Sequence, residues 1–260
     1  MLIAKANKSL KNKPAGTLQV YRNKSSYQYY YRSTPNVKNG TYISKKRMPF
    51  IRALAQKSYD QKFLTAAETL RKDILAFPDR YCIPQGMHAF YQLLAAVYEN
   101  LTPARQELVT PYVLPDDMFI QSWLAVEYVG KPFDPDDPEL YTNRGERVRS
   151  KSEKMIADKL LDLQIPYRYE YPIYIRRLGT VHPDFMMLDI LTRENVMFEH
   201  FGRMHEARYV NKTLTKLEAY EEDGWHLGDN FLFTMESSDH IINLTHFEKM
   251  IRRRFPYISS

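Results

Sequence analysis

Two short acidic segments carry residues whose types and spacing suit metal-dependent chemistry. Residues 182–185 read His-Pro-Asp-Phe, and residues 199–202 read Glu-His-Phe-Gly. Asp is disfavoured within a strand, and the charge of Glu199 is costly to bury between phenylalanines, so Asp184 and Glu199 both need a compensating partner. Magnesium is such a partner, because it takes oxygen ligands, keeps several waters and binds phosphate oxygens, and one of its waters can act as a nucleophile. The alternative is that Asp184 caps a turn and Glu199 pairs with a nearby Lys or Arg.

The segments around these carboxylates are expected to alternate between helix and strand. Apolar residues spaced three and four apart predict a helix over residues 150–163, with Glu153 on its core-facing side. The elements that follow are expected to be three strands, a helix, a strand and a closing helix, over residues 167–176, 180–190, 195–202, 206–222, 230–236 and 245–255. Asp184 then lies on the second strand and Glu199 on the third.

This order of elements, with a Glu in the first helix, Pro-Asp on the second strand and Glu on the third, resembles the PD-(D/E)xK nuclease superfamily over roughly residues 145–255. The resemblance implies an α/β fold with a restriction-endonuclease-like core, in which helices flank a central mixed sheet. It also implies that Asp184 and Glu199 bind Mg²⁺ or Mn²⁺ and that Glu153 helps to hold the metal or a water. A lysine is expected to stabilise the attacking hydroxide.

The lysine is the one position that departs from the family pattern. It usually follows the strand Glu by two residues, where this chain has Phe201. The family is known to move the lysine to the following helix, where Lys212 and Lys216 lie one turn apart. We favour Lys216, which lies nearer the edge of the buried stripe, over Lys212, although either position also suits a solvated lysine. His200 is the third candidate, but strand alternation turns it away from Glu199 unless a bulge intervenes, and it equally suits a hydrogen-bonded position beneath the sheet.

Glu153 has a second interpretation that does not exclude a site role. Residues 150–153 read Ser-Lys-Ser-Glu, which fits a capping box at the start of a helix.

Composition limits the class of protein. The chain has 260 residues, of which 44% are hydrophobic, and no apolar run approaches the ~18 residues needed to span a bilayer. No membrane role is therefore expected. The short apolar stretch at the amino terminus does not suit a signal peptide, and the single Cys82 cannot form an intramolecular disulfide, so a cytoplasmic location is expected. We expect Cys82 to be a small buried hydrophobe.

Positive charge is concentrated at the amino terminus. Residues 1–60 hold 13 Lys and Arg against the single acid Asp60, which leaves 24 basic against 30 acidic residues in the rest of the chain. Such a basic end indicates a polyanionic partner, since neutralised phosphates and released counterions dominate nucleic-acid affinity. The alternative is a basic tail that serves only solubility.

The pattern within this basic segment predicts a small folded module. Strands are expected over residues 17–22, 27–32 and 41–44, with turns over 23–25 and 36–40 and an amphipathic helix over 48–76. The strands are rich in tyrosine. Three strands and a helix with basic, aromatic faces resemble the arm-binding domain of tyrosine integrases, which implies a sheet laid in the major groove. The residues expected to bind nucleic acid are Lys24, Arg32, Lys45, Lys46 and Arg47.

A helical connector is expected between the two ends. Its helices are predicted over residues 84–100, 102–109 and 115–125. Residues 130–143 have the Pro and Asp content of a linker, and their acidic run lacks the Gly and Glu of a calcium loop. The expected division is thus a nucleic-acid-binding module over residues 1–76, a connector over 77–143 and a nuclease core over 144–260.

These patterns together predict a Mg²⁺- or Mn²⁺-dependent endonuclease, most suited to DNA, with nucleic acid as its partner. The alternative, raised by Phe201 at the lysine position, is a nuclease fold that binds nucleic acid without cleaving it. The sequence also admits a homodimer.

Overall fold

The computed structural model describes residues 1–34 and 39–258, and it forms two compact units. Unit 1 covers Met1–Phe119 and unit 2 covers Ile120–Ser260. The chain is a mixed α/β protein with several separate sheets, as expected. No helix within the described ranges combines the length and apolar character needed to cross a membrane.

Unit 1 contains the three-stranded sheet and the long helix that the sequence predicts. The strands β1 (Thr17–Asn23), β2 (Ser26–Arg32) and β3 (Thr41–Ile43) form an antiparallel sheet in that order. A 3₁₀ turn, η1 (Lys45–Arg47), leads into α2 (Met48–Ala76), so both predictions are confirmed. The turn predicted over residues 36–40 lies largely outside the described residues. The sequence analysis missed the first helix, α1 (Leu2–Leu10), which lies beside α2.

One face of this sheet packs on α2, and the other does not. Leu18, Tyr29 and Ile43 are buried with Ile51 and Leu54 of the helix. Because successive strand side chains point to opposite faces, the residues between them project from the other face. That outer face carries the row Tyr21, Tyr30 and Tyr42 described below.

Short helices complete unit 1 and begin unit 2. They are η2 (Pro78–Tyr81), α3 (Pro84–Glu99), α4 (Pro103–Gln106) and α5 (Asp116–Leu124), and α5 crosses the boundary between the units. The helices predicted here are confirmed, although α4 is shorter than expected. Cys82 is exposed on the turn after η2, so the expectation of a buried cysteine was wrong. Its thiol lies against the carbonyl of Pro78 at 3.4 Å, on a tight turn that has no apolar layer to bury it.

Unit 2 is built on a four-stranded mixed sheet in the order β11-β10-β9-β6. These strands are β6 (Tyr167–Tyr169), β9 (Phe185–Asp189), β10 (Glu194–Phe201) and β11 (Phe231–Met235). The strand β9 runs antiparallel to both β6 and β10, whereas β10 and β11 are parallel. A parallel pair needs a crossover, which α7 (Ala207–Glu222) supplies.

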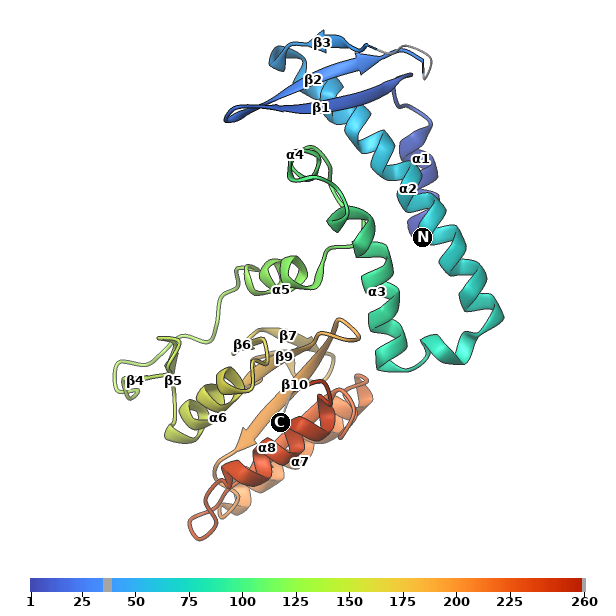
Figure 1. Ribbon diagram of the computed structural model, residues 1–260. Helices are drawn as coiled ribbons and strands as arrows, with labels where there is room; N and C mark the ends of the chain where they lie inside the picture. The colour runs from blue at the N-terminus through green and yellow to red at the C-terminus, as the bar shows by residue number, and fades with distance from the viewer. Residues whose placement is uncertain (35–38, 259–260) are drawn as a thin grey trace. The chain divides into compact units, whose positions relative to one another are not determined.

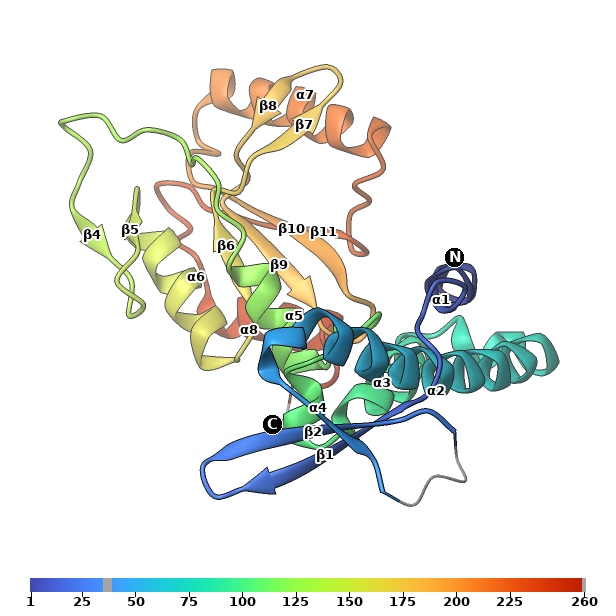
Figure 2. The same ribbon diagram turned by 90° about the horizontal axis from the view of Figure 1, so that it is seen from above.

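Helices cover both faces of this sheet (Figures 1 and 2). On one face, α6 (Lys151–Asp162) and α8 (Leu244–Arg254) share a core with Phe185 and Phe198. On the other face, Ala219 and Tyr220 of α7 pack with Met186 and Met197. The helices and the last two strands match the sequence predictions closely.

Two predicted strands are each broken into two. Residues 167–176 form β6 and β7 (Ile173–Ile175), and residues 180–190 form β8 (Gly179–Val181) and β9. Pro172 and Pro183 lie in the two breaks, where a proline removes the N–H that a continuous ladder requires. The strands β7 and β8 pair with each other as a separate hairpin. Asp184 therefore lies immediately before a strand rather than within one.

The segment over residues 130–143 belongs to unit 2 and is not a boundary between compact units. It ends in a two-stranded ribbon, β4 (Leu140–Tyr141) with β5 (Arg147–Val148). Residues 77–119, which were expected to belong to the connector, lie within unit 1. The acidic segment is held by hydrogen bonds to Arg149, which proline and aspartate content does not reveal.

Candidate active site

Asp184 and Glu199 lie next to each other on the sheet of unit 2. Phe185 of β9 pairs with Phe198 of β10, and the two strands are antiparallel. Asp184, which precedes Phe185, therefore lies beside Glu199, which follows Phe198. The backbone N–H of His200 donates to Asp184 Oδ2 at 2.6 Å, which fixes the aspartate against β10. Two acidic side chains are thus presented together by neighbouring segments of one sheet.

Glu199 has two partners from α7. Its Oε1 atom lies 2.6 Å from Lys216 Nζ and accepts a hydrogen bond from the hydroxyl of Tyr220, also at 2.6 Å. Only 3% of Glu199 is exposed, and a carboxylate buried this deeply requires such partners to remain ionised. Burial, with the adjacent Glu199 carboxylate, raises the pKa of Tyr220, so the phenol stays protonated and donates.

Asp184 has weaker compensation for its charge. Burial raises its pKa well above the ordinary value of 3.8, and the carboxylates of Glu199 and Glu153 raise it further. The His200 N–H and the Lys216 ammonium act in the opposite direction. The residue as a whole is half-buried, and desolvation of its carboxyl group is the largest cause of the raised pKa. The influence of both other carboxylates on Asp184 places all three acids in one electrostatic environment.

Glu153 makes capping contacts at the start of α6, and its carboxylate also influences Asp184. Ser150 Oγ accepts from the N–H of Glu153 at 3.1 Å, and Glu153 Oε2 accepts from the N–H of Arg149 at 2.9 Å. This is a capping arrangement in which the Glu reaches one residue beyond the N-cap Ser. The same oxygen accepts from the hydroxyl of Tyr169 at 2.7 Å. Glu153 is therefore fixed at the helix start and still acts on the charge of Asp184.

The side chain of His200 lies on the face opposite to Glu199. Its Nδ1 is 2.8 Å from Thr234 Oγ1, and its Nε2 is 3.3 Å from Glu236 Oε2 without forming an aligned hydrogen bond. Glu236 is in turn bonded by Ser152 of α6. The structure thus places His200 in the polar layer beneath the sheet and away from Lys216.

The two candidate lysines occupy different positions on α7. Lys216 contacts Glu199 directly, whereas Lys212, one turn earlier, is exposed and lines a cavity beside the β7–β8 hairpin. Tyr209 lies one turn before Lys212, and its pKa is raised by burial and by the nearby charge of Asp184. Tyr220 had not been expected to take part in the site. Tyr220 follows Lys216 by four residues, as Lys216 follows Lys212. The same helical spacing could therefore have identified Tyr220 as a residue near the site.

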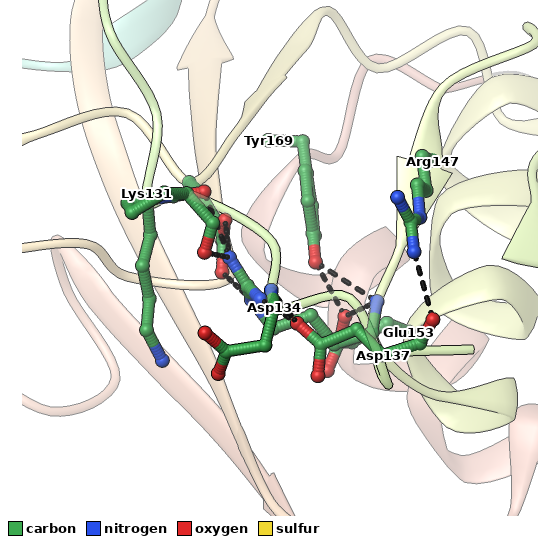
Figure 3. A network of polar contacts seen from close by, with 9 residues as sticks. Lys131, Asp134, Asp137, Arg147, Glu153 and Tyr169 are labelled. Carbon is green, nitrogen blue, oxygen red and sulfur yellow. Dashed lines mark hydrogen bonds and ion pairs between the residues drawn. The ribbon is translucent and has the colours of Figure 1, made fainter. Parts of the chain in front are cut away.

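Arg149 connects the surroundings of two of the three acids. Figure 3 shows Lys131, Asp137, Glu153 and Tyr169 of this polar network. Its guanidinium binds Glu170 at 2.7 Å and Asp137 at 2.7 Å, and it donates to the carbonyls of Lys131 and Pro132. Its own N–H binds Glu153, while the N–H of Glu170 donates to the carbonyl of Asp184 at 3.1 Å. The sequence analysis missed both Arg149 and Glu170, because residues so far from each other in the chain share no local spacing.

The donor set suits a hydrated magnesium ion better than a fully enclosed metal site. Among the described residues, no three or more His, Cys, Asp or Glu side chains form a ready-made ligand cluster. Asp184 Oδ1 and Glu199 Oε2, however, make no hydrogen bond or ion pair with another described residue. Magnesium commonly binds through one or two carboxylates and fills the remaining positions with water and phosphate oxygens. Two free carboxylate oxygens fit that requirement.

No protein-family model, curated protein or solved structure matches this chain.

The residues predicted to bind nucleic acid lie on the sheet module of unit 1. Lys24 is at the β1–β2 turn with a positive φ of 51°, and Arg32 ends β2. Lys45, Lys46 and Arg47 form η1 and are exposed at the start of α2. The aromatic row on the outer sheet face has ring centroids 5.5 Å apart for Tyr21–Tyr30 and 5.7 Å apart for Tyr30–Tyr42.

Proposed function

We propose that the protein is a metal-dependent endonuclease that hydrolyses phosphodiester bonds, with DNA as its substrate. One observation carries this proposal: Asp184 and Glu199 are neighbours on one sheet, and Lys216 lies against Glu199 at 2.6 Å. Two hard oxygen donors beside a cation suit a phosphate group and a divalent metal at once.

The fold supports the same class of enzyme. A helix carrying Glu153 precedes three sheet strands, a crossover helix and a parallel fourth strand. The extra β7–β8 hairpin is inserted between the first two of those strands. This order resembles the restriction-endonuclease-like core, with the lysine carried by the crossover helix instead of by the strand.

Each residue has a distinct role in the proposed reaction. Magnesium, when bound by Asp184 and Glu199, would supply a Lewis acid for the phosphate oxygens. Lys216 places its ammonium where negative charge develops on the phosphate. Tyr220 and the N–H of His200 hold the two carboxylates in place, so that little reorganisation is needed when substrate arrives. Glu153 adds negative charge that favours retention of a cation.

Unit 1 supports nucleic acid as the partner. It holds 18 Lys and Arg against 8 acids, whereas unit 2 holds 19 against 23. The sheet of unit 1 contains no acid, and its outer face offers Gln19 and Gln28 beside Tyr21, Tyr30 and Tyr42. Strands can read base edges in a groove through glutamines, while nearby Lys and Arg neutralise phosphates. We assign this outer face and the basic turn η1 to DNA binding.

The test is a cleavage assay on the full-length chain. Plasmid, linear duplex DNA, single-stranded DNA and RNA are incubated with and without Mg²⁺ or Mn²⁺. We expect metal-dependent DNA cleavage that Asp184→Asn or Glu199→Gln abolishes. Lys216→Ala should lower turnover by several orders of magnitude with little change in affinity, because its charge acts in the transition state. Lys212→Ala should be milder.

A matched control removes a lysine from the far side of the sheet. Lys249 is exposed on α8, and Lys249→Ala should cleave like the unaltered protein. Unchanged cleavage by Asp184→Asn or Glu199→Gln would refute the site. DNA binding without cleavage under any metal condition would instead support the alternative of an inactive nuclease fold.

A further inference from the structure

A cavity of about 820 Å³ lies between α7 and the β7–β8 hairpin of unit 2. Figure 2 shows this hairpin beside α7. Arg208, Lys212 and Lys216 form the helix side of the cavity, together with Asn211. Leu178 and Val181 form the hairpin side. One wall is therefore cationic and the other apolar.

Arg208, Lys212 and Lys216 are spaced four residues apart along α7. Residues four apart lie on one face of a helix and are separated by ~6 Å along its axis, so the cations form a line. The line ends at Lys216, whose ammonium contacts the candidate catalytic Glu199. It therefore leads away from the site of proposed chemistry along the surface of α7.

Two of these cations are not neutralised by the protein. In the described part of the chain, neither Arg208 nor Lys212 makes an ion pair, and none of the residues that line the cavity is acidic. Both side chains are exposed. Like charges four residues apart destabilise a helix, and here no counter-charge offsets that cost. An anion from outside the chain would supply that counter-charge.

The apolar wall restricts the class of anion that fits the cavity. A free phosphate would use only the cationic side. A nucleic-acid strand has a charged phosphate edge and, beside it, sugars and bases with apolar faces, so it complements both walls together. We propose that this cavity is a substrate groove, in which Arg208 and Lys212 bind phosphates that flank the cleaved bond and Leu178 and Val181 contact the sugars and bases.

This proposal rests on the endonuclease function proposed above, and it gives Lys212 a role different from that of Lys216. Lys212 positions substrate, whereas Lys216 acts at the reacting phosphate. The two lysines should thus separate in kinetics, with Lys212 affecting KM and Lys216 affecting kcat.

The experiment measures DNA binding without cleavage. The full-length protein and the double variant Arg208→Ala/Lys212→Ala are titrated onto a labelled duplex in a metal-chelating buffer over a series of salt concentrations. Each phosphate contact contributes about 0.9 to the slope of log affinity against log salt. We expect the double variant to lower that slope by about 1.8, and Lys249→Ala, which removes one charge on the opposite helix layer, to leave it unchanged. If the double variant has the same slope as the unaltered protein, the proposed substrate groove is refuted.

Cleavage kinetics in magnesium provide the second readout. The double variant should raise KM several-fold and should lower kcat far less than Lys216→Ala does. If the unaltered protein cleaves DNA but the salt slope and KM of the variant do not change, the groove fails and the enzyme function stands. If no cleavage occurs but the slope still falls, the groove stands as a binding site and the enzyme function fails.

Discussion

Asp184 and Glu199 have unequal electrostatic surroundings although they are neighbours. Glu199 is paired with the ammonium of Lys216 and the phenol of Tyr220. Asp184 receives one backbone N–H and faces two other carboxylates. Burial and these two carboxylates raise the pKa of Asp184, so the folded protein holds a proton there more tightly than the unfolded chain does. A cation bound between them would replace that proton, so metal affinity should rise with pH.

The raised pKa of Asp184 makes a prediction about stability and pH. Because the folded state holds the proton more tightly than the unfolded state, the stabilisation is complete below the unfolded pKa of 3.8 and is lost as pH rises through the folded pKa. The loss amounts to ~1.4 kcal/mol for each unit of pKa difference. Without metal, Asp184→Asn should therefore become more stable than the unaltered protein as pH increases. Denaturant titrations at several pH values measure this.

Asp136→Asn serves as the control for this measurement, because it removes an exposed carboxylate from the acidic segment. Its stability relative to the unaltered protein should change little with pH. Equal pH dependence for the Asp184 and Asp136 variants would contradict the electrostatic account of the site.

At the scale of elements, the network around Arg149 joins three separate parts of unit 2. It links the segment of Lys131 and Pro132, the start of α6 and the end of β6. Glu170 follows β6 with a positive φ of 48°, a strained conformation for a non-glycine residue, and its carboxylate is buried. The Arg149 guanidinium compensates that charge. Its removal would leave Glu170 both strained and unpaired.

We predict that Arg149→Ala lowers the free energy of unfolding by about 3 kcal/mol, because it leaves the buried charge of Glu170 without a partner. Arg149→Ala/Glu170→Gln should recover part of that loss. Arg177 pairs with Glu222 at 2.7 Å, but 45% and 55% of the two side chains are exposed. Arg177→Ala should therefore cost less than ~1 kcal/mol. Chemical denaturation measures all three, and similar losses for Arg149→Ala and Arg177→Ala would contradict the prediction.

The sequence predicted the elements where apolar periodicity was strong. The helices α2, α6 and α7 have the expected ranges because apolar spacing and caps are local signals. Strand ends were less predictable, since Pro172 and Pro183 interrupt runs that otherwise have strand composition. The choice of Lys216 followed from the family resemblance, which allows the lysine on the following helix, and from its place near the edge of the buried stripe. The Arg149–Glu170 contact did not, because it depends on how distant segments fold together.

At the scale of the whole molecule, charge and candidate chemistry are divided between the two units. Unit 1 carries the excess of basic residues, while the three acids and both candidate lysines lie in unit 2. Each unit also has its own buried clusters. Under the proposed function, this division assigns most of the affinity for DNA to unit 1 and cleavage to unit 2.

We predict that neutralising the turn η1 weakens binding without changing the chemistry. The variant Lys45→Ala/Lys46→Ala/Arg47→Ala should bind duplex DNA less tightly and should lower the salt slope by up to about 2.7, at 0.9 per phosphate contact. At saturating DNA its cleavage rate should equal that of the unaltered protein. Binding titrations and single-turnover kinetics measure the two quantities. An unchanged slope would mean that this basic turn serves folding or solubility.

The exposure of Cys82 has a consequence for the chemistry of the whole chain. It is the only cysteine among the 260 residues, and its thiol is free and accessible on the turn before α3. The chain therefore cannot form a disulfide within itself, and two copies can be joined by a disulfide in only one way, from Cys82 to Cys82. A covalent dimer that disappears on reduction would consequently have a known linkage. A thiol-reactive dye would likewise attach at one defined position, in the unit that does not carry Asp184 and Glu199.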